Sequence, residues 1–501
     1  MARKPTISLE DLEALGAKKL AALVFEETAG SAAFKRRVSA ALAGKSGSEA
    51  IAKLIDRRLA GLERARAFID WDKTQAFRDD LAALLGGIVQ ELGPADPEAG
   101  LDRLLRFLAT HQSVFERVDD SSGHIQGVYE DGIAPIGDIA MRLGPEAARL
   151  LPDKIMERLG DMEHGYLPRV ADQVISHLPP EALIAWEADL ARRCAERHAV
   201  EAGLRASGRW FSSMTDQWRQ IRQSIARAHG DLDHLIALER EKPERSQDTI
   251  RIATLLREVG RIGEALDWVR IGGPPSHTFR FDLDDGEVDS PAVRQALLEA
   301  AIQQDLGREV EARALLWVRF TQTLAPAILR AHLRALPDFE DMEAEERAMA
   351  IALGHADAKP ALQFFLSWPR HDLAARLIVE RRDIWSGSDW QVLPSVAETL
   401  QHDHPLAATI LYRILLDDIL ARARSKAYGH AAKYLHTLDR LAPDSDTAPT
   451  RPESLDIHAN YRAHLKAQHG RKSGFWALVE GRVSRDEPDD RAGRRPSWRQ
   501  V

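Results

Sequence analysis

The 501-residue chain is poor in cysteine, and Cys194 carries its only thiol. A single thiol forms neither an internal disulfide bond nor a site with several thiolate ligands, so multi-cysteine zinc sites and iron–sulfur clusters are excluded. The chain also lacks any run of about 18 or more apolar residues, and we expect no membrane-spanning helix. Its first residues become amphipathic at once, without the apolar core of a signal peptide, which favours a cytosolic location.

An excess of positive charge is also missing. The chain has 68 basic and 77 acidic residues, a formal net charge of −9. This balance argues against a protein that coats nucleic acid, or binds an anionic membrane, through its total charge. Hydrophobic residues make up 44% and charged residues 29%, as in ordinary globular proteins, which excludes a wholly disordered or fibrous chain.

Strand patterns are scarce, whereas helical patterns run almost the whole length. The one strand candidate, residues 279–283, is too short for a stable hairpin of its own, and we interpret it as a loop insertion between helices. Apolar residues at helical spacing form stripes such as Leu101, Leu104, Leu105 and Leu108, or Leu183, Trp186, Leu190 and Cys194. The second stripe predicts that Cys194 is a buried core residue, not a reactive thiol. The fold class is therefore predicted to be all-α.

An internal repeat is the strongest architectural signal. Residues 260–266 are echoed at residues 307–313, and more weakly near residues 359 and 404. The aligned alanines are Ala265, Ala312, Ala361 and Ala407, at steps of 47, 49 and 46 residues, and Trp268, Trp317 and Trp368 follow at similar steps. A turn, a small residue and then a large apolar residue are typical of stacked helix pairs. We therefore expect an α-solenoid of helical hairpins, similar to tetratricopeptide or HEAT arrays, in one continuous superhelix.

Composition shifts suggest four segments. We expect an N-terminal helical array over residues 1–245, helical repeats of about 47 residues over 246–440, and capping helices over 441–480. The boundary after residue 440 rests on the prolines from Pro443 to Pro452. Residues 481–501 are rich in arginine and nearly free of apolar residues, and we expect a disordered tail there.

Three segments, residues 420–435, 469–476 and 114–123, resemble an uncharacterised family of bacterial proteins, a domain of unknown function. The resemblance covers most of residues 5–480 and implies a helical-repeat architecture without an established activity. The C-terminal segments are also similar to the helical part of bacterial SWIM zinc-finger proteins. That finger needs several cysteines, so the resemblance does not imply zinc in a chain whose only cysteine is Cys194.

Three short motifs invite a chemical function and fail on spacing. Residues 44–46 end like a phosphate loop, but Ser39 stands where the motif needs glycine, and no strand precedes it. Residues 282–286 resemble a calcium loop, but Val293 stands where the bidentate glutamate belongs. The histidine clusters at residues 229–234 and 402–404 lack the i, i+4 pairing around a glutamate that builds a helical zinc site.

No nucleophile–base pair can be assembled from the sequence either. The chain has no Gly-x-Ser-x-Gly elbow, and Cys194 is expected to be buried. We therefore predict a non-enzymatic protein with no catalytic residue, no cofactor and no metal site.

The one cluster that suggests binding is C-terminal. Basic residues alternate there with aromatic ones, and the candidate surface consists of Arg422, Arg424, Lys426, Tyr428, Arg471 and Lys472. Cations beside aromatic planes bind acidic protein segments, phosphate groups or single-stranded nucleic acid. The structural alternative is that Phe475 and Trp476 seal the last repeat while the cations form its solvated face.

Two functions follow from this reading. The first is a helical-repeat scaffold or adaptor that binds unidentified protein partners and does not act on a membrane. The alternative is a nucleic-acid-associated protein that uses the C-terminal basic and aromatic surface, which the acidic balance of the chain makes the weaker hypothesis. The sequence does not indicate an oligomeric state.

Overall fold

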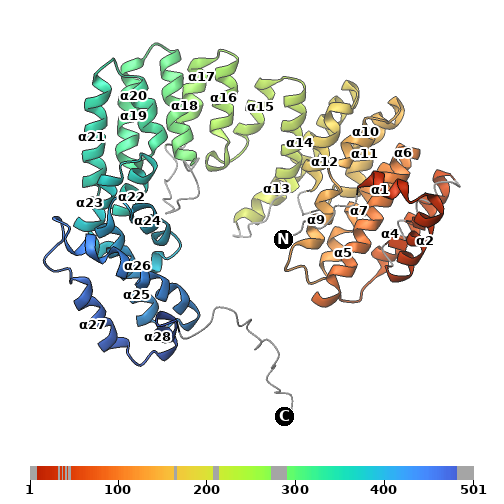
Figure 1. Cartoon of the computed structure of the whole chain (residues 1–501). Helices are drawn as coiled ribbons and strands as arrows, with labels where there is room; N and C mark the ends of the chain where they lie inside the picture. The colour runs from red at the N-terminus through yellow and green to blue at the C-terminus, as the bar shows by residue number, and fades with distance from the viewer. Residues whose placement is uncertain are drawn as a thin grey trace. The chain divides into compact units, whose positions relative to one another are not determined.

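A computed structural model describes residues 8–31, 34–35, 38–39, 42, 47–162, 166–206, 214–271, 273 and 290–481 (Figure 1). Contacts between Cα atoms divide the chain into two compact units, Met1–Pro243 and Glu244–Val501. The strand candidate at 279–283, the motifs at 44–46 and 282–286, and the expected tail beyond Gly481 lie outside the described residues.

Helices account for nearly all regular structure in the described part of the chain. The only β-type pairing among these residues is an isolated parallel bridge between Ile69 and Val118. The predicted all-α fold class is therefore confirmed for the described residues. Across the same described ranges, no helix is both long enough and apolar enough to cross a lipid bilayer.

The helices of unit 1 are α1 (Leu9–Ala14), α2 (Ala17–Gly30), α4 (Ser48–Arg64), α5 (Trp71–Gly86), the π-helix η1 (Gly87–Leu92), α6 (Gly93–Ala95), α7 (Pro97–Ala109), α8 (His111–Phe115), α9 (His124–Asp131), α10 (Pro135–Ala140), α11 (Pro145–Leu159), α12 (Tyr166–Val174), η2 (Ile175–His177), α13 (Pro180–Ala206), α14 (Met214–Ala228) and α15 (Leu232–Arg240). The predicted leucine stripe of α7 is buried in their common core. Cys194 also lies in this core, as predicted, and burial raises the pKa of its thiol.

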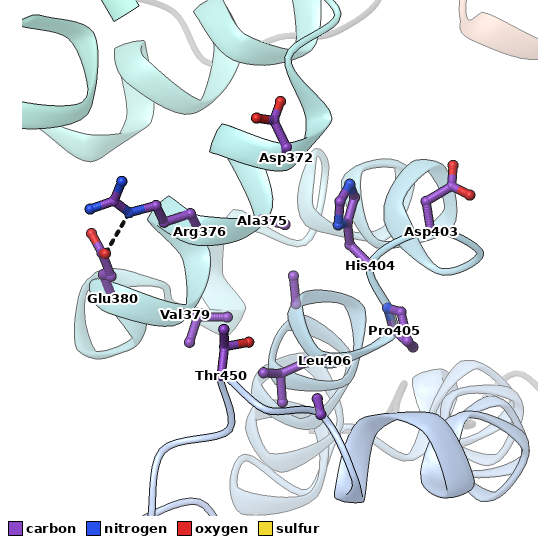
Figure 2. A pocket seen from close by; sticks show the side chains of 12 residues that line it. Asp372, Ala375, Arg376, Val379, Glu380, Asp403, His404, Pro405, Leu406 and Thr450 are labelled. Atoms are coloured by element: carbon purple, nitrogen blue, oxygen red, sulfur yellow. Dashed lines mark hydrogen bonds and ion pairs between the residues drawn. The ribbon is translucent and has the colours of Figure 1, made fainter. Parts of the chain in front are cut away.

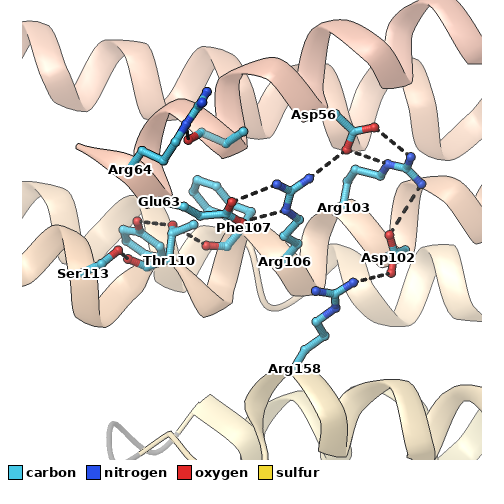
Figure 3. A network of polar contacts seen from close by, with 12 residues as sticks. Asp56, Glu63, Arg64, Asp102, Arg103, Arg106, Phe107, Thr110, Ser113 and Arg158 are labelled. Atoms are coloured by element: carbon cyan, nitrogen blue, oxygen red, sulfur yellow. Dashed lines mark hydrogen bonds and ion pairs between the residues drawn. The ribbon is translucent and has the colours of Figure 1, made fainter.

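A polar network on the surface of unit 1 connects α4, α7 and α11 (Figure 3). Arg106 of α7 donates to Glu63 at 2.7 Å and to Asp56 at 3.0 Å, both on α4. Its hydrogen bond to Glu63 lowers the pKa of that carboxyl group. Arg158 of α11 lies 3.6 Å from Asp102 of α7. Because these groups are partly exposed, each pair contributes only about 0.2–1 kcal/mol, so the network positions helices more than it stabilises them.

The helices of unit 2 are η3 (Glu244–Ser246), α16 (Thr249–Glu258), α17 (Ile262–Arg270), α18 (Pro291–Asp305), α19 (Glu309–Thr323), α20 (Pro326–Arg334), α21 (Glu340–Gly354), α22 (Ala358–Ser367), α23 (His371–Glu380), η4 (Arg382–Ile384), η5 (Gly387–Asp389), α24 (Leu393–Leu400), α25 (Pro405–Ala421), η6 (Ser425–Ala427), α26 (Tyr428–Asp446), α27 (His458–His469) and α28 (Ser473–Val479). From α16 to α21, each helix packs against the next one along the chain (Figure 1).

One type of turn recurs between consecutive helices. At Gly230, Gly260, Gly307 and Ala423 the backbone has a positive φ, between 51° and 80°. The residue after each of them donates its N–H to the carbonyl five residues back, as Arg261 does to Leu256 at 2.8 Å and Arg308 does to Gln303 at 2.9 Å. This bond closes the end of the first helix, and the positive φ reverses the chain. Glycine fits three of the four positions because it has no Cβ to clash in this conformation.

The alanines that define the predicted repeat are all buried, near the N-terminal ends of α17, α19, α22 and α25. The turns in front of these helices differ, however. Gly260 and Gly307 form the same left-handed turn 47 residues apart, whereas α22 is capped by the side chain of Asp357 and α25 follows His404. The same turn therefore recurs after 47 residues only once, from Gly260 to Gly307. The alanines recur because each helix needs a small residue where its neighbour approaches.

The expected boundary between residues 440 and 441 is wrong, because α26 continues through it to Asp446. The buried stripe of this helix runs from Ala431 to Leu441 without interruption. Pro443 lies inside the helix. The C-terminal helices α27 and α28 are therefore part of the packing of unit 2.

Candidate interaction surfaces

The structure places Arg422 and Arg424 at the end of α25, where both bind the same carboxylate. Arg422 Nε lies 2.8 Å from Asp418 Oδ1, and Arg424 Nη1 lies 3.4 Å from Asp418 Oδ2. The Asp418 side chain is only 13% exposed. Its single negative charge offsets one of the two positive charges, and both arginine side chains remain exposed to solvent.

Tyr428 at the start of α26 packs against α28, while Lys426 lies two residues before it in η6 and Arg471 and Lys472 lie just before α28. The Tyr428 ring lies 6.0 Å from the buried Phe475 ring, in edge-on contact. The adjacent indole of Trp476 donates to the carbonyl of His469 at 3.0 Å and closes the turn between α27 and α28. Lys426 and Arg471 are exposed, and Lys472 is half-buried. The aromatic residues therefore seal the end of unit 2, as the structural alternative expected, and the remaining cations surround this seal.

A buried polar layer lies beneath this region, between α25 and α27. Arg413 is 5% exposed, donates to the carbonyl of Asp456 at 2.7 Å and lies over the Tyr461 ring. The Tyr461 hydroxyl donates to Asp417 at 2.8 Å. Burial lowers the pKa of Arg413 and raises the pKa of both Asp417 and Tyr461. These contacts fasten α27 to α25.

A pocket of about 500 Å³ lies between α23, the first turn of α25 and residues 448–450 (Figure 2). Its volume falls in the range of small-ligand sites. Arg376 is bound to Glu380 at 2.7 Å, and the Arg370 guanidinium holds the pKa of Asp372 at about 2. The remaining polar side chains in the wall are Asp403, His404 and Thr450. Two of the charged groups in the wall, Asp372 and Arg376, are therefore already bound within the fold.

A different basic and aromatic surface lies on α19 to α22. Trp317 of α19 and Trp368 at the end of α22 are both half-buried, and a chain of ring contacts through Phe320 and Phe364 connects them. The indole N–H of Trp368 donates to Glu345 of α21 at 2.7 Å. We call Arg313, Trp317, Arg330, His332, Arg347 and Trp368 the tryptophan–arginine surface.

An arginine lies over the ring of each tryptophan of this surface. The Arg347 guanidinium lies over the Trp317 ring at 5.6 Å, and the Arg330 guanidinium lies over the Trp368 ring at 5.3 Å. Within the described part of the chain, neither Arg313 nor Arg347 has a carboxylate oxygen within 4 Å. His332 lies 5.1 Å from Trp317, and burial together with the charges of Arg347 and Arg313 lowers its pKa. The surface therefore holds cations that the fold itself does not neutralise.

Comparison with protein families matches residues 2–478 to the model of a family of unknown function, DUF6880. The chain belongs to this family. The match confirms the resemblance to an uncharacterised family and, like it, brings no activity. The curated proteins and the solved structures contain no match to the chain.

Since DUF6880 provides no known site, only the residues themselves indicate one. No group of three or more histidine, cysteine, aspartate or glutamate side chains is arranged for a metal ion within the described ranges. The sequence analysis singled out Trp317 and Trp368 as repeat positions but missed the tryptophan–arginine surface. Its arginines lie on three helices, at residues 313, 330 and 347, and form no cluster in the sequence. The sequence holds no local signal that would bring these arginines together, because their proximity depends on the packing of α19, α20 and α21.

Proposed function

We propose that this chain is a non-enzymatic adaptor whose stacked helical hairpins bind protein partners. The observation that carries the proposal is the tryptophan–arginine surface. It combines partly exposed indole rings with two arginines, Arg313 and Arg347, that have no carboxylate partner among the described residues, and tryptophan and arginine are enriched at the energetic centres of protein interfaces. The packing of each helix on its chain neighbour from α16 to α21 supports a solenoid of tetratricopeptide or HEAT type within unit 2.

The alternative, binding of nucleic acid through the C-terminal cluster, has weaker support. Cations are exposed there, but Phe475 is buried and Tyr428 and Trp476 are partly buried against it, so the aromatic rings serve the packing of unit 2. Binding of single strands needs both a continuous cationic track and stacking platforms. The bacterial origin, the cytosolic location and the similarity to SWIM proteins stay predictions from the sequence.

Affinity purification of the tagged full-length chain from cell extract tests the proposal, with and without nuclease treatment. We expect a reproducible set of captured proteins that resists nuclease and is lost in the double variant Arg313→Glu with Arg347→Glu. Arg319→Glu is the matched control, because Arg319 also lies on α19, its guanidinium donates to Gln322 at 3.3 Å, and a residue two positions from Trp317 does not share its helix face. Capture that disappears with nuclease would favour the alternative function.

A further inference from the structure

We propose that the tryptophan–arginine surface binds an aspartate- and glutamate-rich segment of a partner protein, with carboxylates of the segment held by Arg347 and Arg313. This inference rests on the proposed adaptor function and names the chemistry of its partner. The observation behind it is that these cations, on α19 and α21, are oriented by the fold but left without an acidic partner.

The arginine geometry suits carboxylates. A guanidinium that lies over an aromatic ring uses its face for the ring and keeps its N–H edges directed outward. Arg347, which is exposed and lies over Trp317, is therefore held in place while its donors remain accessible. Two parallel N–H donors match the two oxygens of a carboxylate, and this bidentate pairing is stronger than a single hydrogen bond. Prior ordering by the ring also reduces the conformational entropy lost on binding.

Two cations of this surface have the matching sign. The charged groups with a described contact here are Arg313, Arg330, Arg347, Arg370, Glu345, Asp372 and His332, while Glu309 and Glu343 stand four residues before Arg313 and Arg347 on the same helices. Glu345 accepts from the Trp368 indole, and Asp372 is bound to Arg370. Arg313 and Arg347 therefore remain without a carboxylate oxygen within 4 Å among the described residues, although the chain as a whole is acidic. Cations left in this way attract a complementary acidic segment and fix its register.

The same geometry disfavours nucleic acid. Bases bind single-strand proteins by stacking on open aromatic faces. Here Arg347 covers one side of the Trp317 ring, while His332 and Phe320 pack against it at 5.1 and 5.9 Å. Trp368 is likewise covered by Arg330 and packed against Phe364 at 5.8 Å. These contacts reduce the indole surface available for stacking by a base, whereas the exposed guanidinium of Arg347 remains usable by carboxylates.

Fluorescence anisotropy with the full-length chain tests the proposal, using a labelled octaglutamate peptide as the probe. We expect saturable binding that weakens with added salt and falls about tenfold in Arg347→Ala, because a charge-assisted bidentate contact is lost. Arg347→Lys keeps the positive charge but lacks the two parallel N–H donors of the guanidinium, so it should give an intermediate affinity. The control Arg319→Glu should bind like the wild-type chain. Thermal melting of each variant shows whether it is folded, and Arg347 is exposed enough for its removal to be tolerated.

The possible outcomes separate this proposal from the adaptor function. Absence of octaglutamate binding, equal weakening in Arg319→Glu, or tighter binding of a labelled oligothymidylate would each overturn the acidic-segment proposal. If nuclease-resistant protein capture persists in those cases, the adaptor function stands with a partner of other chemistry. If octaglutamate binds as expected but the chain captures no protein, the adaptor function fails and the binding chemistry of the surface stands.

Discussion

Unit 2 contains two clusters of basic and aromatic residues, and the fold pairs their cations to different degrees. In the C-terminal cluster, Arg422 and Arg424 share the nearly buried carboxylate of Asp418, and Phe475 is fully buried. On the tryptophan–arginine surface, Arg347 lies over a half-buried ring and has no acid beside it in the described structure. Basic and aromatic residues in proximity therefore do not define a binding surface. A cation can bind a partner only if no carboxylate of the chain is already bound to it, and an aromatic ring only if no neighbouring helix already covers it.

The largest effect that we expect comes from the aromatic seal of the C-terminal cluster. Phe475→Ala removes a fully buried ring between α26 and α28 and should lower the free energy of unfolding by about 3–5 kcal/mol. Trp476→Ala should cost less, because that side chain is only partly buried. Urea denaturation of both variants measures the difference. Small and equal losses of unfolding free energy in the two variants would show that neither ring is buried in solution. The C-terminal cluster would then not differ from the tryptophan–arginine surface.

Gly387 offers a second test of how tightly Asp418 is held. A Cβ atom at Gly387 would overlap the Cβ of Asp418, so Gly387→Ala should destabilise the fold by about 1–3 kcal/mol. Gly429→Ala is the control, because a Cβ there meets no atom within 4 Å and alanine favours the helix α26. Chemical denaturation should rank the two variants on opposite sides of the wild-type chain. An unchanged Gly387→Ala protein would mean that Asp418 is free to move away from its arginines.

Asp418→Asn should make the C-terminal cluster resemble the tryptophan–arginine surface, with arginines that have no carboxylate partner. The change keeps the shape of the side chain, removes its charge and frees Arg422 and Arg424, at a cost of about 1 kcal/mol in stability. We expect this variant to gain octaglutamate affinity by severalfold, measured by the same anisotropy assay. Asp403→Asn, at an exposed position just before α25, should gain none. A variant without added affinity would indicate that neutralisation by Asp418 is not what distinguishes the two clusters.

The smallest expected effect is a pH dependence at His332. Burial, Arg347 and Arg313 lower the pKa of this imidazole in the folded chain, while the unfolded chain has the ordinary value of about 6.5. The unfolded state therefore binds more protons, and the stability that His332 contributes is present above about pH 6.5 and is lost as the pH falls through its folded pKa. Denaturation from pH 7.5 to 5 should show this loss of stability, and His332→Gln should reduce it.

The contribution of Arg347 can be measured separately, by an NMR titration of Arg347→Ala. We expect the pKa of His332 to rise toward its ordinary value in this variant. An unchanged pKa would place Arg347 away from Trp317 in solution.

Much of the local architecture was predictable because it depends on neighbours along the chain. The stripe that contains Cys194 is buried, and the repeat alanines lie where helices approach, since a period of 3.6 residues brings apolar side chains to one face of a helix. The turns at Gly260 and Gly307 were visible as a repeated motif. The boundary after residue 440 was predicted wrongly, because the apolar stripe of α26 overrides the prolines that follow it.

The sequence by itself therefore determined the helices, their buried faces and the absence of a multi-cysteine site. Only the tertiary structure decided which charges remain available. Arg347 and Trp317 are 30 residues apart and meet because α19 and α21 pack together, whereas the pairing of Arg424 with Asp418 depends on the left-handed turn at Ala423. Helix formation depends on local periodicity, but the neutralisation of a charge depends on where distant side chains are brought by packing, and periodicity carries no information about that.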